Sequence, residues 1–323
     1  MTVDQLAGVA AAVFGPHGRL IGVSRLRGGS KKGVYRLHRE DGGTAIAYLW
    51  DDAESYWPAA AVEEDHADPF SHASGIDLFL AAHHRLTALD VRVPRLLLAD
   101  RSRTLHPAEL VVVEDVPGEH LGALLDRDPA AARPVLARLA GTLALMRRQS
   151  APAFGKVALV DGGGSSRGTS CERTVLDRAL ADLAEAATRD ERMAAVRDRV
   201  AARLHDLAGR VRPRAEHVLV HGELGPDHVL VDGRGEPVLI DIEGLMYFDA
   251  EWEHVFLRLR FDEHYHHLRV DGLDQRRLAL YALAMSLSLV AGPLRLLDGD
   301  FPDRAFMLGI VEHNLSEVLA ALG

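Results

Sequence analysis

Two short segments in the last third of the chain combine carboxylate and imidazole side chains at a spacing that suits phosphoryl transfer. The first is residues 221–228 (HGELGPDH), and the second is residues 240–243 (IDIE). An acid followed five residues later by a metal-binding side chain, with a second acid after a strand, serves to orient an acceptor hydroxyl and to hold a divalent cation against nucleotide phosphates. The two segments therefore predict a phosphate-transfer site.

A β-hairpin is expected to position both segments. The apolar runs 229–231 and 238–240 flank the turn sequence Asp232-Gly233-Arg234-Gly235, which is typical of a hairpin. Because the two strands of a hairpin lie side by side, the groups before the first strand and after the second are expected at neighbouring strand ends.

The rest of the pattern divides the chain into a β-rich first third and a mainly helical remainder. Strands are expected at 34–37, 45–50 and 110–113, with one helix over 76–89. Further helices are expected, one of them opened by Thr169 and Glu172, which have the spacing of a capping box. The predicted fold is α+β and bilobal: a small N-terminal nucleotide-binding lobe (1–113), a hinge (114–119) and a large, mainly helical C-terminal lobe (120–323) for catalysis and acceptor binding.

These motifs resemble the aminoglycoside and macrolide phosphotransferase family, whose fold is protein-kinase-like. The family's usual form is His-Gly-Asp, four residues, Asn or His, and later Ile-Asp-x-Glu/Asp, which the segments at 221–228 and 240–243 resemble. Residues 27–37 (RGGSKKGVYRL) look like its glycine-rich loop, and residues 111–119 (VVVEDVPGE) look like its hinge. The order and spacing of these motifs extend the resemblance over most of the chain, with atypical residues in the catalytic loop.

The resemblance implies a role for each acidic or imidazole group. Glu223 stands where the family has its catalytic aspartate, and it is expected to act as an altered base. Asp241 is implied as the principal metal ligand, Glu243 as a second ligand, and His228 as a ligand where most kinases have asparagine. Because Mg²⁺ prefers oxygen donors, Mn²⁺ is an alternative cofactor, and activity is expected to fall when acid protonates the imidazole.

The resemblance also implies ATP or GTP as the phosphate donor. The expected contacts to the nucleotide are Gly28, Gly29, Ser30, Lys31, Lys32, Gly33, Tyr48, Glu114 and Val116. Tyr48 occupies the place of the family's phosphate-binding lysine, and no lysine lies on that strand. Lys31 and Lys32 are either its replacement or solvated loop residues. The acid that would pair with such a lysine is Asp77, Glu63 or Glu64.

Composition argues against several classes of protein. The formal net charge of -10 disfavours a nucleic-acid partner, because phosphate backbones need a basic surface. Cys171 is the single cysteine, which fits a reducing compartment. The apolar run 6–14 lacks a basic leader and is too short to span a bilayer. We therefore expect a cytoplasmic protein without a membrane partner.

The sequence predicts a phosphotransferase that moves the γ-phosphate of ATP or GTP to a hydroxyl of a small molecule, with an antibiotic as the leading acceptor. Acidic stretches at 51–68 and 241–263 would attract polycations such as aminoglycosides or basic peptides, and a solvated acidic face explains the first stretch equally well. Two alternatives stay open: a pseudokinase-like protein that binds nucleotide or ligand without turnover, and a metabolic small-molecule kinase. Tyr48 and Glu223 are the reason for the first alternative.

Overall fold

The computed structural model describes residues 1–15, 18–26, 30–57, 65–71 and 74–322, and its contacts divide the chain into two compact units. Unit 1 consists of Met1–Glu63, His72–Leu139 and Pro226–Gly244, and unit 2 consists of Glu64–Ser71, Ala140–Gly225 and Leu245–Gly323. The stretch 114–119 expected to be a hinge lies within unit 1. The functional lobe boundaries stay a prediction.

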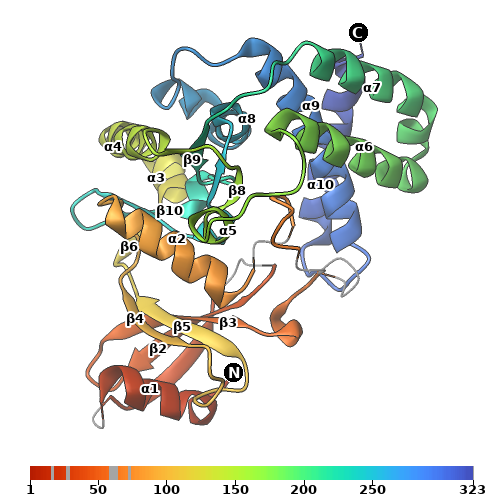
Figure 1. The fold of residues 1–323 in the computed structure, drawn as a ribbon. Helices are drawn as coiled ribbons and strands as arrows, with labels where there is room; N and C mark the ends of the chain where they lie inside the picture. Colours follow the sequence, from red (N-terminus) through yellow and green to blue (C-terminus); the bar gives the residue numbers. More distant parts are fainter. Residues whose placement is uncertain (16–17, 27–29, 58–64, 72–73, 323) are drawn as a thin grey trace. The chain divides into compact units, whose positions relative to one another are not determined.

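Unit 1 is built on a five-stranded antiparallel sheet, seen at the bottom of Figure 1. In spatial order its strands are β1 (Leu20–Arg25), β2 (Gly33–Arg39), β3 (Thr44–Trp50), β5 (Glu109–Glu114) and β4 (Leu96–Asp100). The helices that lie wholly within this unit are α1 (Ala7–Phe14), α2 (Ile76–Ala88) and α3 (Leu121–Arg127). The three predicted strands and the helix over 76–89 are confirmed, with ends that differ by one or two residues.

The alternation of side chains along β3 gives the sheet two apolar faces. Leu49 is buried in a cluster that includes Val9 of α1. On the other face, Tyr48 and Trp50 pack against Phe79 of α2, with ring centroids 5.7 and 6.0 Å from that of Phe79. Tyr48 is therefore oriented toward the α2 side of the sheet.

The hairpin forms as predicted, within a second sheet of unit 1. Its strands are β10 (Val229–Asp232) and β11 (Pro237–Leu239), and β6 (Gly118–His120) pairs with the other edge of β10. Gly118 adopts a φ of 154°, and a Cβ there would lie 1.9 Å from the carbonyl oxygen of Val231. Only glycine lets β6 approach β10 this closely.

Unit 2 is mainly helical. Its helices are α5 (Val157–Asp161), α6 (Cys171–Arg189), α7 (Glu191–Gly209), α8 (Ala250–Phe261), α9 (Gln275–Leu296) and α10 (Arg304–Ala320), and α4 (Pro129–Arg147) runs from unit 1 into unit 2. Its antiparallel sheet has the order β7 (Ser150–Ala151), β9 (His217–Val220), β12 (Met246–Phe248) and β8 (Gly155–Lys156).

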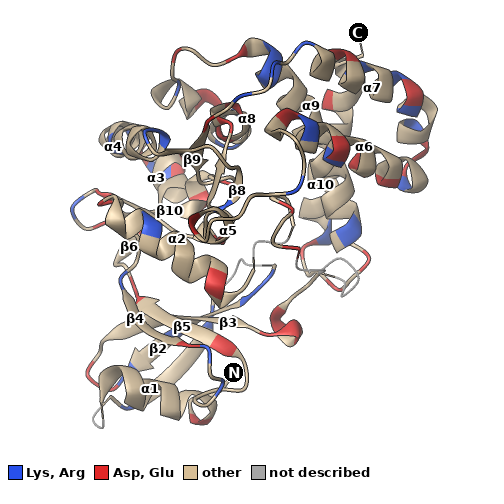
Figure 2. Ribbon diagram, in the orientation of Figure 1, with Lys and Arg blue, Asp and Glu red and all other residues tan. Residues whose placement is uncertain are grey.

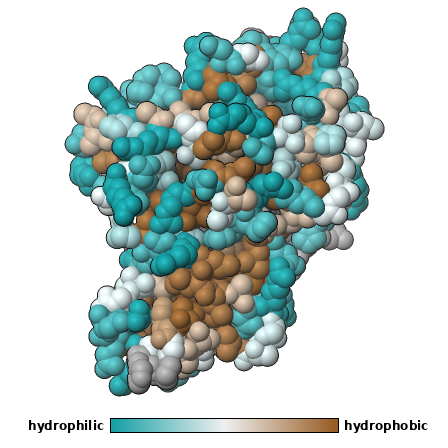
Figure 3. All heavy atoms as spheres, turned by 60° about the vertical axis from the view of Figure 1, so that its left-hand side comes forward, coloured by the Kyte–Doolittle hydropathy of each residue, from teal (hydrophilic) through white to brown (hydrophobic). Residues whose placement is uncertain are grey.

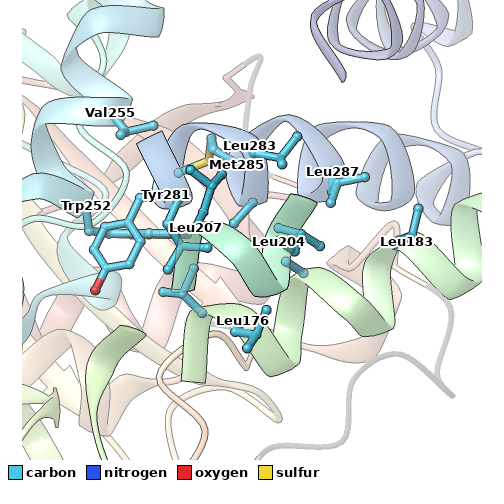
Figure 4. Packing of buried hydrophobic residues seen from close by; sticks show 14 of the residues in the cluster. Leu176, Leu183, Leu204, Leu207, Trp252, Val255, Tyr281, Leu283, Met285 and Leu287 are labelled. Atoms are coloured by element: carbon cyan, nitrogen blue, oxygen red, sulfur yellow. The ribbon is translucent and has the colours of Figure 1, made fainter. Parts of the chain in front are cut away.

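Apolar side chains from α6, α7, α8, α9 and α10 contribute to the core of unit 2, part of which Figure 4 shows. Leu176 and Leu183 of α6 meet Leu204 of α7, and Tyr281 and Leu287 of α9 pack against them. The one helix of the described chain that is long and apolar enough to cross a membrane is α9, and 61% of its apolar stretch is buried. Such burial is typical of a core helix.

The capping box expected at Thr169 and Glu172 is wrong. The helix begins after Ser170, whose hydroxyl accepts no hydrogen bond from a backbone amide of the first turn. Glu172 is buried, and its Oε2 accepts a hydrogen bond from Arg277 at 3.2 Å. A capping box needs the acid three residues after the N-cap, but Glu172 is only two residues after Ser170, and its Oε1 accepts from the Ser170 hydroxyl at 2.5 Å and not from a backbone amide.

The surface is mixed in character. Basic and acidic residues are interleaved along α6 and α7, as Figure 2 shows. Figure 3 shows a broad apolar area on the face that it presents.

Candidate active site

The candidate metal-binding groups of unit 1 lie together at the open end of the hairpin, one just before its first strand and one just after its second. His228 ends the turn before β10, and Asp241 follows β11, where the amide of Ile240 donates to the carbonyl of His228 at 3.0 Å. His228 Nε2 lies 3.6 Å from Asp241 Oδ2. Asp241 has a φ of 56°, a left-handed conformation that aspartate tolerates better than most residues. The hairpin thus brings these two predicted ligands together.

The side chain of Lys32, from the loop before β2, contacts the same carboxylate. Its Nζ donates to Asp241 Oδ1 at 2.9 Å and also to Glu243 Oε1. The ammonium group lies 4.8 Å from the centroid of the Tyr48 ring, which is a cation–π contact. Of the two loop lysines, Lys32 is buried and paired, so the solvated alternative does not hold for it.

The charges of this cluster stabilise one another. Burial by itself lowers the pKa of Lys32, but the carboxylates of Asp241 and Glu243 raise it well above its ordinary value. Lys32 holds the pKa of Asp241 well below its usual range, although burial acts in the opposite direction. Burial raises the pKa of Tyr48 to about 12, so its phenol stays neutral. The cluster combines an ammonium, two acids and a neutral aromatic ring.

The donors in this cluster fit a divalent cation. The side chain of Asp241 is 43% exposed, and His228 lies beside it, so one ion can reach both. A carboxylate with an imidazole suits Mn²⁺ as well as Mg²⁺. Glu243 is only 3% exposed, and its Oε1 is occupied by Lys32. Asp241 and His228 would therefore hold the metal, and a metal contact from Glu243 stays a prediction.

The loop before β2 is held by the segment that follows β3. The amide of Tyr56 donates to the carbonyl of Ser30 at 2.9 Å, and Trp57 Nε1 donates to Ser30 Oγ at 2.9 Å. A Cβ on Gly33 would lie 2.8 Å from the Glu54 carboxylate, so glycine permits this packing. The carbonyl of Lys31 accepts from Ser74 Oγ at 3.4 Å. The predicted contacts Gly28 and Gly29 lie outside the described residues.

The predicted hinge contacts have structural partners of their own. Glu114 Oε1 accepts from Arg92 Nη2 at 2.8 Å, and Glu114 Oε2 accepts from the amide of Arg95 at 3.1 Å. Burial raises the pKa of Glu114, but Arg92 and the amide of Arg95 outweigh it and lower the pKa. Val116 is buried at 6% exposure. A nucleotide contact by Glu114 or Val116 therefore stays a prediction.

In unit 2, the loop that carries Glu223 rests on an acid that the sequence reading did not recognise as a site residue. Glu253 of α8 is 5% exposed, and its Oε2 accepts from the amide of Gly222 at 3.1 Å. Burial raises the pKa of Glu253 to about 7, against the lowering effect of the amides of Gly222 and His221. Glu223 is exposed between the buried residues Gly222 and Leu224, which leaves its carboxylate accessible to an acceptor.

Three acids of the stretch after the hairpin do not form the predicted acidic surface, although Asp262 and Glu263 of the same stretch are exposed. Asp249 and Glu251 are each 1% exposed. Asp249 accepts from Arg277 at 2.5 Å, and Glu251 is bound by both terminal nitrogens of Arg214 at 2.6 and 2.7 Å. With Glu253 also buried, attraction of polycations by these three acids is excluded. The sequence alone could not show that arginines elsewhere in the chain neutralise two of them.

A second group of metal-binding side chain types lies in the core of unit 2. Cys171, His217 and Asp249 are all buried, and their ligand atoms lie within 4.8 Å of one another. Two arginines contact Asp249: Arg214 Nη1 lies 3.5 Å from its Oδ1, and Arg277 Nη1 lies 2.5 Å from its Oδ2. Burial raises the pKa of Cys171, which keeps the thiol protonated. Because the thiol stays protonated and both oxygens of Asp249 are engaged by arginines, this is a structural cluster.

Comparison with solved structures shows the fold. A spectinomycin phosphotransferase, APH(9)-Ia, in complex with ADP and spectinomycin has a TM-score of 0.66 at 11% identity, over 99% of this chain and 98% of that one. A thermostable mutant of the aminoglycoside phosphotransferase APH(4)-Ia (D198A), with ADP and hygromycin B, has a TM-score of 0.59 at 18% identity, over 96% and 98%. The choline kinase LicA from Streptococcus pneumoniae has a TM-score of 0.58 at 14% identity, over 94% of each chain.

These likenesses confirm the predicted α+β, protein-kinase-like fold. Comparison with curated proteins gave no match. The sequence profile of the phosphotransferase enzyme family, APH, matches residues 22–284, which include β2, the hairpin and the first part of α9. The chain therefore belongs to the phosphotransferase enzyme family.

Proposed function

We propose that the protein transfers the γ-phosphate of ATP or GTP to a hydroxyl group of a small molecule. The observation that carries this proposal is the cluster of unit 1 in which Lys32 pairs with Asp241 while His228 lies 3.6 Å from the same carboxylate. Phosphoryl transfer depends mainly on positioned positive charge, and this cluster combines an ammonium with a site for a metal. The ADP complexes of two similar phosphotransferases support a nucleotide donor.

In the proposed reaction, Glu223 accepts the proton of the acceptor hydroxyl while the hydroxyl oxygen forms a bond to the γ-phosphorus. The bond from that phosphorus to the bridging oxygen breaks, and the nucleoside diphosphate leaves. A divalent cation held by Asp241 and His228 would neutralise charge on the phosphate oxygens. The segment Ser30 to Gly33 covers the phosphates, and Glu253 fixes the backbone before Glu223.

The similar structures differ in the acceptors that their names give. The similar structures include a spectinomycin phosphotransferase and a choline kinase, so antibiotics and metabolites are both represented. We propose a small molecule with a free hydroxyl, and among antibiotics we retain aminoglycosides, macrolides and basic peptides. The buried acids Asp249, Glu251 and Glu253 no longer favour a polycation.

The experiment is a transfer assay with ATP or GTP labelled on the γ-phosphate, and with spectinomycin, hygromycin B, a macrolide, a basic peptide and choline as acceptors. We expect a labelled acceptor with the native protein and none with Asp241→Asn, which removes the charge of the principal metal ligand. Nucleotide binding without transfer to any acceptor on a broad hydroxyl panel would instead favour the pseudokinase-like alternative.

A further inference from the structure

The strand that should supply a phosphate-binding lysine has none. β3 has the sequence TAIAYLW, and its Tyr48 is oriented toward the α2 side of the sheet, where the ring contacts Phe79. Burial raises the pKa of Tyr48 to about 12, so the phenol is neutral, and it has no positive charge with which to replace an ammonium group. A positive charge must therefore come from another part of the chain.

Lys32 brings that charge to the position above Tyr48. In the pairing of β2 with β3, Gly33 lies opposite Leu49 and Val34 lies opposite Tyr48, so Lys32 directly precedes the paired residues. Its side chain crosses to the α2 side, where Nζ lies 4.8 Å from the Tyr48 ring centroid and 2.9 Å from Asp241 Oδ1. The ammonium thus lies over β3 although it comes from the loop before β2.

The carboxylate that holds this lysine also has an unusual origin. On α2 the single acid is Asp77, whose side chain is 72% exposed and pairs with Arg101 at 2.6 Å. Glu243 is instead 3% exposed and binds Lys32 through Oε1. Its other oxygen, Oε2, has no hydrogen-bond partner among the described residues. Of the sequence candidates, Glu63 and Glu64 lie outside the described residues.

We infer that Lys32 is the phosphate-contacting lysine of this protein, relocated from β3 to the loop before β2, and that Glu243 and Tyr48 are its positioning residues. This inference rests on the proposed function, because it assigns the phosphate contact of the same site. Glu243 then orients the ammonium from one side and the Tyr48 ring supports it from another. Lys32 contacts Oδ1 of Asp241, and Oδ2, which lies 3.6 Å from His228 Nε2, is left for a cation.

The relocated lysine can be tested by removing it and by placing a lysine back on β3. Lys32→Ala should weaken ATP and ADP binding by about ten- to a hundredfold, because a charge-assisted hydrogen bond is lost. Adenosine affinity should stay unchanged, because adenosine has no phosphate. Lys31→Ala should weaken ATP binding far less than Lys32→Ala. The matched control is Arg39→Ala. Arg39 lies at the far end of β2, where its guanidinium contacts the ring of Phe14 of α1, and its loss should leave the affinities for ATP, ADP and adenosine unchanged.

The decisive variant is the double substitution Lys32→Ala/Tyr48→Lys, which moves the ammonium to β3. We expect it to regain much of the ATP affinity, and this variant also decides the question if Lys32→Ala alone does not fold. Glu243→Gln should weaken ATP binding and leave adenosine binding intact. Affinities are measured by calorimetry, and folding by thermal unfolding.

Each failure has a separate meaning. If the native protein binds neither ATP nor GTP with any metal, the proposed function fails. If the native protein binds ATP and a folded Lys32→Ala variant binds it equally well, Lys32 does not contact the phosphates. If Lys32→Ala loses ATP affinity but the folded double variant does not regain it, the Lys32 ammonium does not occupy the place of a β3 lysine, and the inference is wrong. If Glu243→Gln keeps native ATP affinity, Glu243 is not a positioning residue.

Discussion

Glu223 differs from the aspartate of related catalytic loops by one methylene group, which moves its carboxylate by about one bond length. Glu223 is exposed between buried neighbours, and the amide of Gly222 before it donates to Glu253 at 3.1 Å. A carboxylate at this point can orient a hydroxyl, and a loose transition state asks little more of a base.

Glu223→Gln should lower the rate of phosphate transfer by about a hundredfold or more, because an amide cannot accept the proton. Nucleotide affinity should not change, since Glu223 is not proposed to contact the donor. Glu223→Asp is the conservative control and should keep measurable activity. Steady-state kinetics with the best acceptor, together with nucleotide titration, checks both points. Equal rates for Glu223→Gln and the native protein would remove Glu223 from catalysis.

Glu253 should make stability depend on pH. Its pKa is raised to about 7 by burial, so the folded protein binds a proton that the unfolded chain releases. The stabilisation is therefore complete below the ordinary glutamate pKa of about 4.5 and is lost as pH rises through about 7. Glu253→Gln keeps an oxygen for the Gly222 amide and cannot ionise.

Urea unfolding at about pH 5 and about pH 8 compares the two proteins. The native protein should lose more stability between these values than Glu253→Gln does. Glu253→Ala should be less stable than either, because the amide of Gly222 would lose its buried acceptor. The same pH dependence in the native protein and in Glu253→Gln would show that Glu253 does not titrate in this range.

At the scale of elements, local patterns predicted most of what formed. The alternation in β3, the turn between β10 and β11 and the periodicity of α2 each act over a few residues, and each element is present. The pairing of Lys32 with Asp241 joins residues 209 positions apart, so no local pattern could indicate it. Glu253 was equally hidden, because sequence alone does not show which acids of a helix face inward.

The start of α9 is predicted to depend on a buried ion pair. Arg277 is 1% exposed and donates to Asp249, which also accepts from Tyr281, and to Glu172 at 3.2 Å. Removing one partner of a buried pair leaves an uncompensated charge, so Arg277→Ala should cost about 3 kcal/mol or more of unfolding free energy.

The matched control is the exposed neighbour Arg276→Ala on the same helix, which should change stability by less than about 0.5 kcal/mol. Urea titration of both variants measures the difference. Similar losses for Arg276→Ala and Arg277→Ala would mean that the buried network does not stabilise α9.

At the scale of the whole molecule, the fold and family could be predicted from the order of the motifs, and the acceptor could not. The motifs recur because nucleotide and metal chemistry fixes their spacing, whereas acceptor contacts come from side chains whose burial depends on distant partners. Asp249 and Glu251 illustrate this, since the sequence predicts acidic surface for both, whereas both are buried and paired with arginines. The expected cytoplasmic location also stays a prediction.

The most direct test of the central claim is calorimetric titration of the native protein with ATP and GTP, in Mg²⁺, in Mn²⁺ and with all metal removed by a chelator. The account predicts that at least one nucleotide binds, and that chelation weakens its binding because Asp241 and His228 then hold no cation against the phosphates. Absence of binding by both nucleotides under every condition would contradict the phosphotransferase function proposed for this chain.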